Sequence, residues 1–151
     1  MGSINRKVKE LPTICQWAYY NLVPFENRYG EEYKKTLEFL MKSSKWSEES
    51  RKDYQLTELK HMLSHCYWNV PYYRKIFIDN QWMVEDFQTI EDLKNFPVLT
   101  KKIIMENQKD LIAQNFKYQR PYPITTSGSS GDKLQIFVND DVFKREAAFN
   151  M

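Results

Sequence analysis

The sequence is poor in glycine, cysteine and histidine: its 151 residues include four glycines, two cysteines and two histidines. Cys15 and Cys66 are far apart and form no Cys-x-x-Cys pair, which excludes the dense disulfide framework of a small secreted domain. No apolar run approaches the roughly 18 residues that a membrane-crossing helix needs, and no signal-peptide pattern follows the basic N-terminus. These absences predict a cytoplasmic protein with reduced thiols and no transmembrane segment.

The sequence also lacks an excess of charge of one sign. Its 22 basic residues are interleaved with 20 acidic ones, which gives a formal net charge of +2. Because no basic block or nucleic-acid motif accompanies that balance, nucleic acid is not an expected partner. Hydrophobic residues make up 42% of the chain and charged residues 28%, as in a globular protein rather than a disordered one.

An apolar and aromatic segment, "LPTICQWAYYNLVPF" (11–25), lies near the N-terminus between two prolines. We interpret it as a short packed helix that covers part of the core. A helix on a membrane surface is the alternative, but Trp17, Tyr19 and Tyr20 do not segregate from a basic face as such helices require.

Apolar periodicity predicts two further helices. Within residues 31–45, apolar side chains recur at i, i+4 and i+7: Tyr33, Leu37 and Leu40. Within residues 48–67, one stripe holds most of the apolar side chains: Leu56, Leu59, Met62, Leu63 and Cys66. Pro71 disfavours a helical conformation at Val70, so the second helix should end just before this pair.

Capping signals predict two small helices around Pro97. Thr89 and Asp92 resemble a capping box in which Asp replaces the usual Glu, and Thr100 is a suitable N-cap for the second helix. Further on, "ITT" (124–126) and "LQIFV" (134–138) are rich in β-branched and aromatic residues, which predicts two strands of a hairpin.

A last helix is expected from about residue 141, capped by Asn139 or Asp140. It reaches Met151 without the glycine, proline or polar tail that usually ends a helix. We therefore expect the chain to be truncated.

The predicted strands flank "TTSGSSG" (125–131), which contains two of the four glycines and five hydroxyl side chains. Successive backbone N–H groups in a tight turn can bind an anion, glycine lets the backbone approach it, and hydroxyls add donors. The spacing differs from the G-x-x-x-x-G-K-[ST] phosphate loop. On composition alone, a phosphate-binding loop and an exposed hairpin turn are both open interpretations.

Three segments in order carry a resemblance to a known family. They are "VPYYR" (70–74), "DLKNFPVLTK" (92–101) and the Ser/Thr/Gly segment (125–131). In this order and spacing they resemble the N-terminal region of phenylacetate–CoA ligase, a member of the adenylate-forming superfamily. The resemblance is closer still to relatives of that enzyme that belong to capsular polysaccharide biosynthesis.

The resemblance implies an α/β fold. A helical N-terminal region (1–120) would lead into the first strands of an adenylate-forming, acyl-CoA synthetase-like domain. Residues 121–151 would be the incomplete start of its nucleotide-binding subdomain.

The resemblance also implies a function. The family uses ATP and Mg²⁺ to convert a small-molecule carboxylic acid into an acyl-adenylate and pyrophosphate, and many members then pass the acyl group to a thiol such as coenzyme A. The residues that match its phosphate loop are Thr126, Ser127, Gly128, Ser129, Ser130 and Gly131, with Lys133 as a further nucleotide-binding residue. The sequence departs from the family motif at Asp132 and Lys133, where Lys or Thr followed by Pro is usual. Catalytic residues are expected beyond residue 151.

Two other interpretations remain beside an active ligase. One is a catalytically inactive, truncated relative that acts as a binding or interaction protein. The other is a metal site at His61 and His65, which are one helical turn apart, but "HMLSH" lacks the glutamate of His-Glu-x-x-His. We expect no metal ligands in this chain, no nucleophile–base arrangement, and a solvated face at Arg74 and Lys75.

Overall fold

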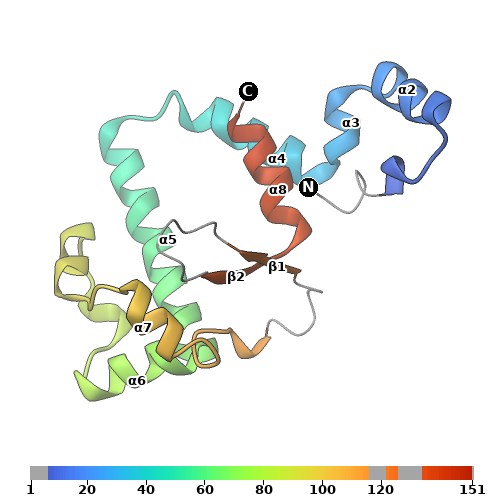
Figure 1. The fold of residues 1–151 in the computed structure, drawn as a ribbon. Helices are drawn as coiled ribbons and strands as arrows, with labels where there is room; N and C mark the ends of the chain where they lie inside the picture. The colour runs from blue at the N-terminus through green and yellow to red at the C-terminus, as the bar shows by residue number, and fades with distance from the viewer. Residues whose placement is uncertain (1–6, 116–121, 126–133, 151) are drawn as a thin grey trace. The chain divides into compact units, whose positions relative to one another are not determined.

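The computed structural model of the protein describes residues 7–115, 122–125 and 134–150 (Figure 1). Most of the described chain is helical, and its elements follow one another in this order: α2 (Thr13–Leu22), α3 (Phe25–Tyr29), α4 (Glu31–Ser43), α5 (Glu48–Asn69), α6 (Pro71–Asp79), η1 (Val84–Asp86), η2 (Ile90–Asn95), α7 (Lys101–Glu106), β1 (Tyr122–Thr125), β2 (Gln135–Val138) and α8 (Asp140–Phe149). The helices predicted at 31–45 and 48–67 are confirmed to within two residues at each end.

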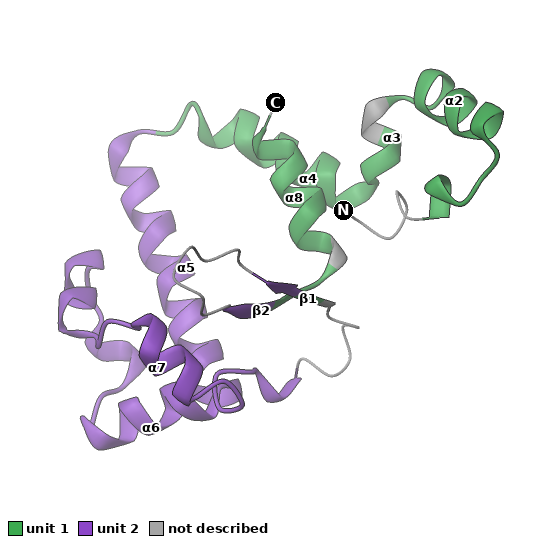
Figure 2. Cartoon of the chain, viewed as in Figure 1, with its two compact units in different colours: residues 1–46, 121–123, 137–151 green, residues 47–120, 124–136 purple. Residues whose placement is uncertain are grey.

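The chain divides into two compact units (Figure 2). Unit 1 comprises residues 1–46, 121–123 and 137–151, and unit 2 comprises residues 47–120 and 124–136. The domain boundary predicted at residue 120 stays a prediction.

Polar N-cap side chains stabilise the N-termini of three helices. Each accepts a hydrogen bond from a first-turn N–H group that has no partner within the helix. The hydroxyl of Ser47 accepts from the N–H of Ser50 at 3.1 Å. The predicted caps are confirmed: Thr100 Oγ1 accepts from the N–H of Ile103 at 3.3 Å, and Asn139 Oδ1 accepts from that of Val142 at 3.2 Å.

The predicted capping interaction between Thr89 and Asp92 is also confirmed. One carboxylate oxygen of Asp92 accepts hydrogen bonds from the N–H of Thr89 at 2.7 Å, from its hydroxyl at 3.0 Å and from the N–H of Gln88 at 2.9 Å. These donors, chiefly the N–H of Thr89, hold the pKa of the Asp92 carboxyl below its usual range because they stabilise the ionised form. These hydrogen bonds therefore fix the backbone of Gln88 and Thr89 at the start of η2.

The corner between α5 and α6 is fixed by Pro71 and Arg74. α5 ends at Asn69, as predicted, and α6 begins with Pro71 as its first residue. The Arg74 guanidinium turns back and donates hydrogen bonds to the carbonyl oxygens of Tyr67, at 2.9 Å, and Trp68. The expectation that Arg74 is part of a solvated face is wrong, because its charge satisfies carbonyl groups that the end of α5 leaves without helical partners.

α6 ends in a Schellman turn that contains no glycine. Gln81 has a φ of 56°, in the left-handed region that usually takes glycine. The N–H of Trp82 donates to the carbonyl of Phe77 at 2.9 Å, and the N–H of Gln81 donates to that of Ile78 at 3.1 Å. The turn brings Trp82 back to the cluster that contains Phe77.

An aromatic cluster forms the core of unit 2. Its buried members are Leu63, Phe77 and Phe87, and half-buried side chains pack around them: Leu59, Tyr67, Trp82, Val84 and Phe96. The Phe77 ring centre lies 5.6 Å from that of Tyr67, 5.7 Å from Phe96 and 6.1 Å from Phe87. Such edge-on and tilted pairs each contribute roughly 0.5–1.5 kcal/mol beyond area burial. Met62 was predicted to share the apolar stripe of α5, but it is exposed.

In unit 1, α4 packs against α8. Tyr33 of α4 and Ala148 of α8 are buried, and the predicted stripe of α4 is confirmed by Tyr33 and by the half-buried Leu37 and Leu40. An ion pair between Glu32 and Arg145, at 3.4 Å, joins the two helices. Because it is solvent-exposed, it contributes no more than about 1 kcal/mol, so the apolar contact determines the packing.

The prediction of an α/β fold is wrong for the described residues. The structure is 68% helical, and β1 and β2 form a two-stranded antiparallel sheet of four residues each. The physical reason lies in the pattern: residues 13–106 have helical periodicity and caps, and the alternation that favours strands is confined to two short segments. The prediction of two strands flanking the Ser/Thr/Gly segment is confirmed.

We expect Phe77→Ala to destabilise unit 2 by about 3–5 kcal/mol, because it would leave a cavity within the aromatic cluster. Ile78→Ala, on the adjoining exposed position, is the matched control and should change stability by no more than about 0.5 kcal/mol. Urea unfolding followed by near-ultraviolet circular dichroism measures both. Equal effects of the two substitutions would contradict the placement of Phe77 at the centre of the core.

Candidate functional site

The residues predicted to bind phosphate lie outside the described residues: Thr126, Ser127, Gly128, Ser129, Ser130, Gly131 and Lys133. The described chain stops at Thr125, the last residue of β1, and resumes at Leu134, one residue before β2. The strands on either side of this gap, β1 and β2, pair with each other.

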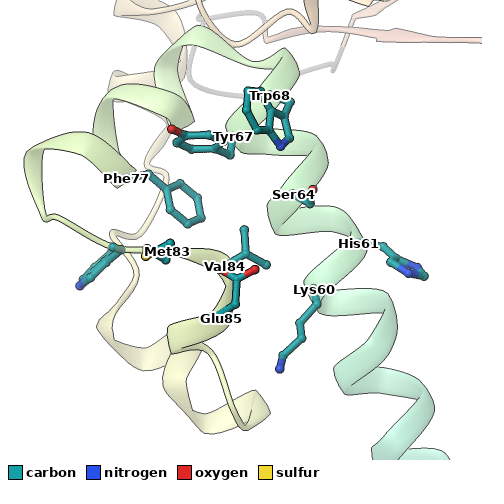
Figure 3. Close-up of a pocket in the computed structure, with 10 residues that line it drawn as sticks. Lys60, His61, Ser64, Tyr67, Trp68, Phe77, Met83, Val84 and Glu85 are labelled. Atoms are coloured by element: carbon teal, nitrogen blue, oxygen red, sulfur yellow. The ribbon is translucent and has the colours of Figure 1, made fainter.

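The described residues form a separate candidate site, a hollow of about 470 Å³ in unit 2 (Figure 3). This volume falls within the range of small-molecule pockets. One wall comes from α5 and the other from α6 and the residues around η1. The residues of α5 that line it are Lys60, His61, Ser64, Tyr67 and Trp68, and those of the other wall are Phe77, Trp82, Met83, Val84 and Glu85.

Helical spacing accounts for the α5 wall. Lys60, Ser64, Tyr67 and Trp68 stand at i, i+4, i+7 and i+8, which places their side chains along one face of the helix. The opposite wall depends on the turn that ends α6, since this turn directs Trp82, Met83 and Val84 back toward α5. In Figure 3, Tyr67 and Phe77 lie next to each other, and the side chain of Val84, the first residue of η1, lies on the side that faces α5.

The hollow has an apolar interior and a polar rim. Its interior is the exposed edge of the aromatic cluster, with Tyr67, Phe77 and Trp82. Its rim carries a cation at Lys60, a carboxylate at Glu85 and a hydroxyl at Ser64. Such a surface can bind an apolar or aromatic group whose polar atoms face the rim.

The two histidines contact residues of their own helix. Nδ1 of His61 lies 3.3 Å from a carboxylate oxygen of Glu58, and Nδ1 of His65 lies 3.3 Å from the side-chain nitrogen of Asn69. The described part of the chain contains no group of three or more His, Cys, Asp or Glu side chains that could hold a metal ion. The structure thus gives no support to the metal-site interpretation at His61 and His65.

Cys66 lies beside Tyr73 in a half-buried position on α5. Burial raises the pKa of the Cys66 thiol, because the thiolate loses solvation. Burial also raises the pKa of the Tyr73 hydroxyl, with smaller contributions from Cys66 and Tyr72. A thiol with a raised pKa is a poor nucleophile at neutral pH.

The sequence analysis missed this hollow. Lys60, Ser64 and Tyr67 share a helix face, and that signal was present in the spacing. Trp82 and Val84 line the same site because the backbone of Gln81 adopts the left-handed conformation that turns the chain after α6. Nothing in the local sequence marks Gln81 as part of a Schellman turn.

We expect the two thiols to react at different rates with an aromatic disulfide reagent at about pH 8. In the Cys15→Ser variant, the remaining Cys66 should react at least roughly tenfold more slowly than Cys15 does in the Cys66→Ser variant, because burial limits both access and ionisation. The Cys66 rate should rise with pH as the thiolate fraction grows, and in urea the two rates should converge. Equal rates in the folded protein would contradict the burial of Cys66.

Comparisons with known proteins give no relative: the chain matches no family model, no curated protein and no solved structure. Among the described residues, no helix is both long and apolar enough to cross a membrane.

Proposed function

We propose that this chain is the N-terminal, phosphate-binding part of an ATP-dependent, AMP-forming carboxylic acid ligase. The observation that carries the proposal is the Ser/Thr/Gly segment (125–131), preceded by "VPYYR" (70–74) and "DLKNFPVLTK" (92–101) in the order and spacing of that family. The substrate class is a small-molecule carboxylic acid. The acceptor, a thiol such as coenzyme A, and a role in capsular polysaccharide biosynthesis follow from the resemblance.

The chemistry of the segment supports phosphate binding. It offers hydroxyl donors, backbone N–H groups next to two glycines, and a cation at Lys133. The strands on either side of it, β1 and β2, pair with each other. Asp132 adds a negative charge that has to point away from bound phosphate or be offset by Lys133.

The two upstream segments supply further support, because the positions they share with the family carry structural roles in unit 2. Val70 is buried and Arg74 closes the corner between α5 and α6. Phe96 belongs to the aromatic cluster and Thr100 caps α7. A resemblance confined to chance surface positions would not select residues on which the packing depends.

In the proposed reaction, the carboxylate of the substrate attacks the α-phosphorus of ATP, the bond to the β-phosphate oxygen breaks, and pyrophosphate leaves. ATP supplies the adenylyl group that the carboxylate acquires. The part of this chain is to hold the β- and γ-phosphates through hydroxyls, N–H groups and Lys133, so that they are aligned and their charge is stabilised. Mg²⁺ is commonly held by substrate phosphates together with one or two carboxylates.

We expect the chain to bind MgATP through the loop. Ser127→Ala combined with Ser129→Ala removes two donors to phosphate, each worth roughly 1.5–3 kcal/mol, and should weaken binding at least about tenfold. Equilibrium dialysis with labelled ATP measures the affinity. The control is Ser44→Ala combined with Thr57→Ala, which removes two exposed hydroxyls, one just after α4 and one in α5, and should leave the affinity unchanged. Equal affinities for the loop variant and the wild type would remove the loop from the proposal.

Catalysis is tested separately, by acid-dependent ATP–pyrophosphate exchange with the product of the complete reading frame. A ligase should catalyse this ATP–pyrophosphate exchange, and the variant with Ser127→Ala and Ser129→Ala should abolish it. MgATP binding without any exchange would overturn the ligase and favour the inactive binding relative.

A further inference from the structure

The hollow in unit 2 carries two opposite charges that the protein leaves unpaired. Lys60, from α5, and Glu85, from η1, stand on its two walls. Within the described ranges, neither side chain forms an ion pair with the other or with a third residue. The histidine of the lining, His61, contacts Glu58 through Nδ1. A ligand that enters the hollow therefore meets a cation on one wall and a carboxylate on the other.

The hollow has a charged end and an aromatic end (Figure 3). Lys60 and Glu85 lie at one end in this view, and Tyr67 and Phe77 lie at the other. Lys60 and Tyr67 are two turns of α5 apart, which corresponds to about 10 Å along the helix. Ser64 lies between them on the same face, and its hydroxyl has no hydrogen-bond partner among the described residues. The arrangement suits a ligand whose ring and charged groups are separated by a short linker.

The aromatic end offers both ring edges and ring faces. The ring centre of Tyr67 lies 5.6 Å from that of Phe77 and 5.0 Å from that of Trp68, in edge-on pairs. Trp82 packs against the same cluster, and Trp68 is 65% exposed. A further aromatic ring can add to such a group by the same edge-on or offset contacts. The volume of about 470 Å³ is within the range that holds a small molecule.

We propose that this hollow binds a small aromatic zwitterion, such as a free aromatic amino acid. The ring of the ligand would pack at the aromatic end. Its carboxylate would pair with Lys60 and accept a hydrogen bond from Ser64, and its ammonium group would pair with Glu85.

The two charges of the hollow select this class over its neighbours. An aromatic monocarboxylate would gain the contact with Lys60 but would face the negative charge of Glu85, and an aromatic amine would meet the reverse. A ligand that carries both charges satisfies both walls. The proposal does not depend on nucleotide binding, and its test contains no nucleotide.

An NMR titration of the full chain tests the proposal through the indole N–H signals of its four tryptophans. We expect L-phenylalanine to shift the signals of Trp68 and Trp82, which line the hollow, and not those of Trp17 and Trp46 in unit 1. Phenylpropanoate lacks the ammonium group and phenylethylamine lacks the carboxylate. Each should bind about three- to fivefold more weakly, because charge pairs that water reaches are weak.

Two neutral substitutions separate the two charges. Lys60→Met should weaken the binding of L-phenylalanine about three- to fivefold without weakening that of phenylethylamine, and Glu85→Gln should do the same without weakening that of phenylpropanoate. The retained ligand shows in each case that the hollow is still formed. The matched controls are Lys75→Met and Glu91→Gln, which remove the same charges from exposed positions outside the lining. They should leave the affinity for L-phenylalanine unchanged.

Three results would overturn the proposal. The first is no shift of the Trp68 and Trp82 signals with L-phenylalanine at about 10 mM, a concentration that detects even weak binding. The second is equal affinity for L-phenylalanine, phenylpropanoate and phenylethylamine, which would mean that the hollow accepts any aromatic group. The third is an unchanged affinity for L-phenylalanine in both Lys60→Met and Glu85→Gln, which would place the two charges outside the site.

Discussion

The packing of Phe77 is the interaction on which the structure of unit 2 depends. Its buried ring contacts α5 through Tyr67, and the segments after α6 through Phe87 and Phe96. The Arg74 corner and the turn at Gln81 place the two ends of α6 so that this ring faces inward. The candidate hollow is the exposed edge of the same cluster, so its shape is fixed by the core rather than by a separate loop.

Local signals made much of the fold predictable. The break at Pro71, the caps at Thr100 and Asn139, and the strands on both sides of the Ser/Thr/Gly segment each depend on residues within a few positions of one another. The features that were missed depend on tertiary context. Arg74 was assigned to solvent because its carbonyl partners lie one helix earlier, and the α/β fold was carried over from a family resemblance rather than from strand patterns.

The candidate site was predictable only in part. The composition of segment 125–131 left a phosphate-binding loop and a hairpin turn as open interpretations, and the strands beside it were predictable from their β-branched residues. The hollow near Lys60 and Trp82 was not, because no local pattern brings the residues after α6 against α5. The sequence likewise predicted that α2 covers part of the core. An apolar segment alone does not show whether its side chains are buried or exposed.

We infer that segments 70–74 and 92–101 belong to one cooperative unit built on the aromatic cluster. Native-state hydrogen exchange tests it directly, through the N–H groups of Trp82 and Phe96, which donate to Phe77 and Leu93, and that of Leu63 in α5. The account predicts that all three exchange through a single opening with the same free energy and denaturant dependence. The inference would be contradicted if the N–H groups of Trp82 and Phe96 exchanged through separate openings. Those openings would have a much lower free energy and a weaker denaturant dependence than the opening that exposes the N–H of Leu63.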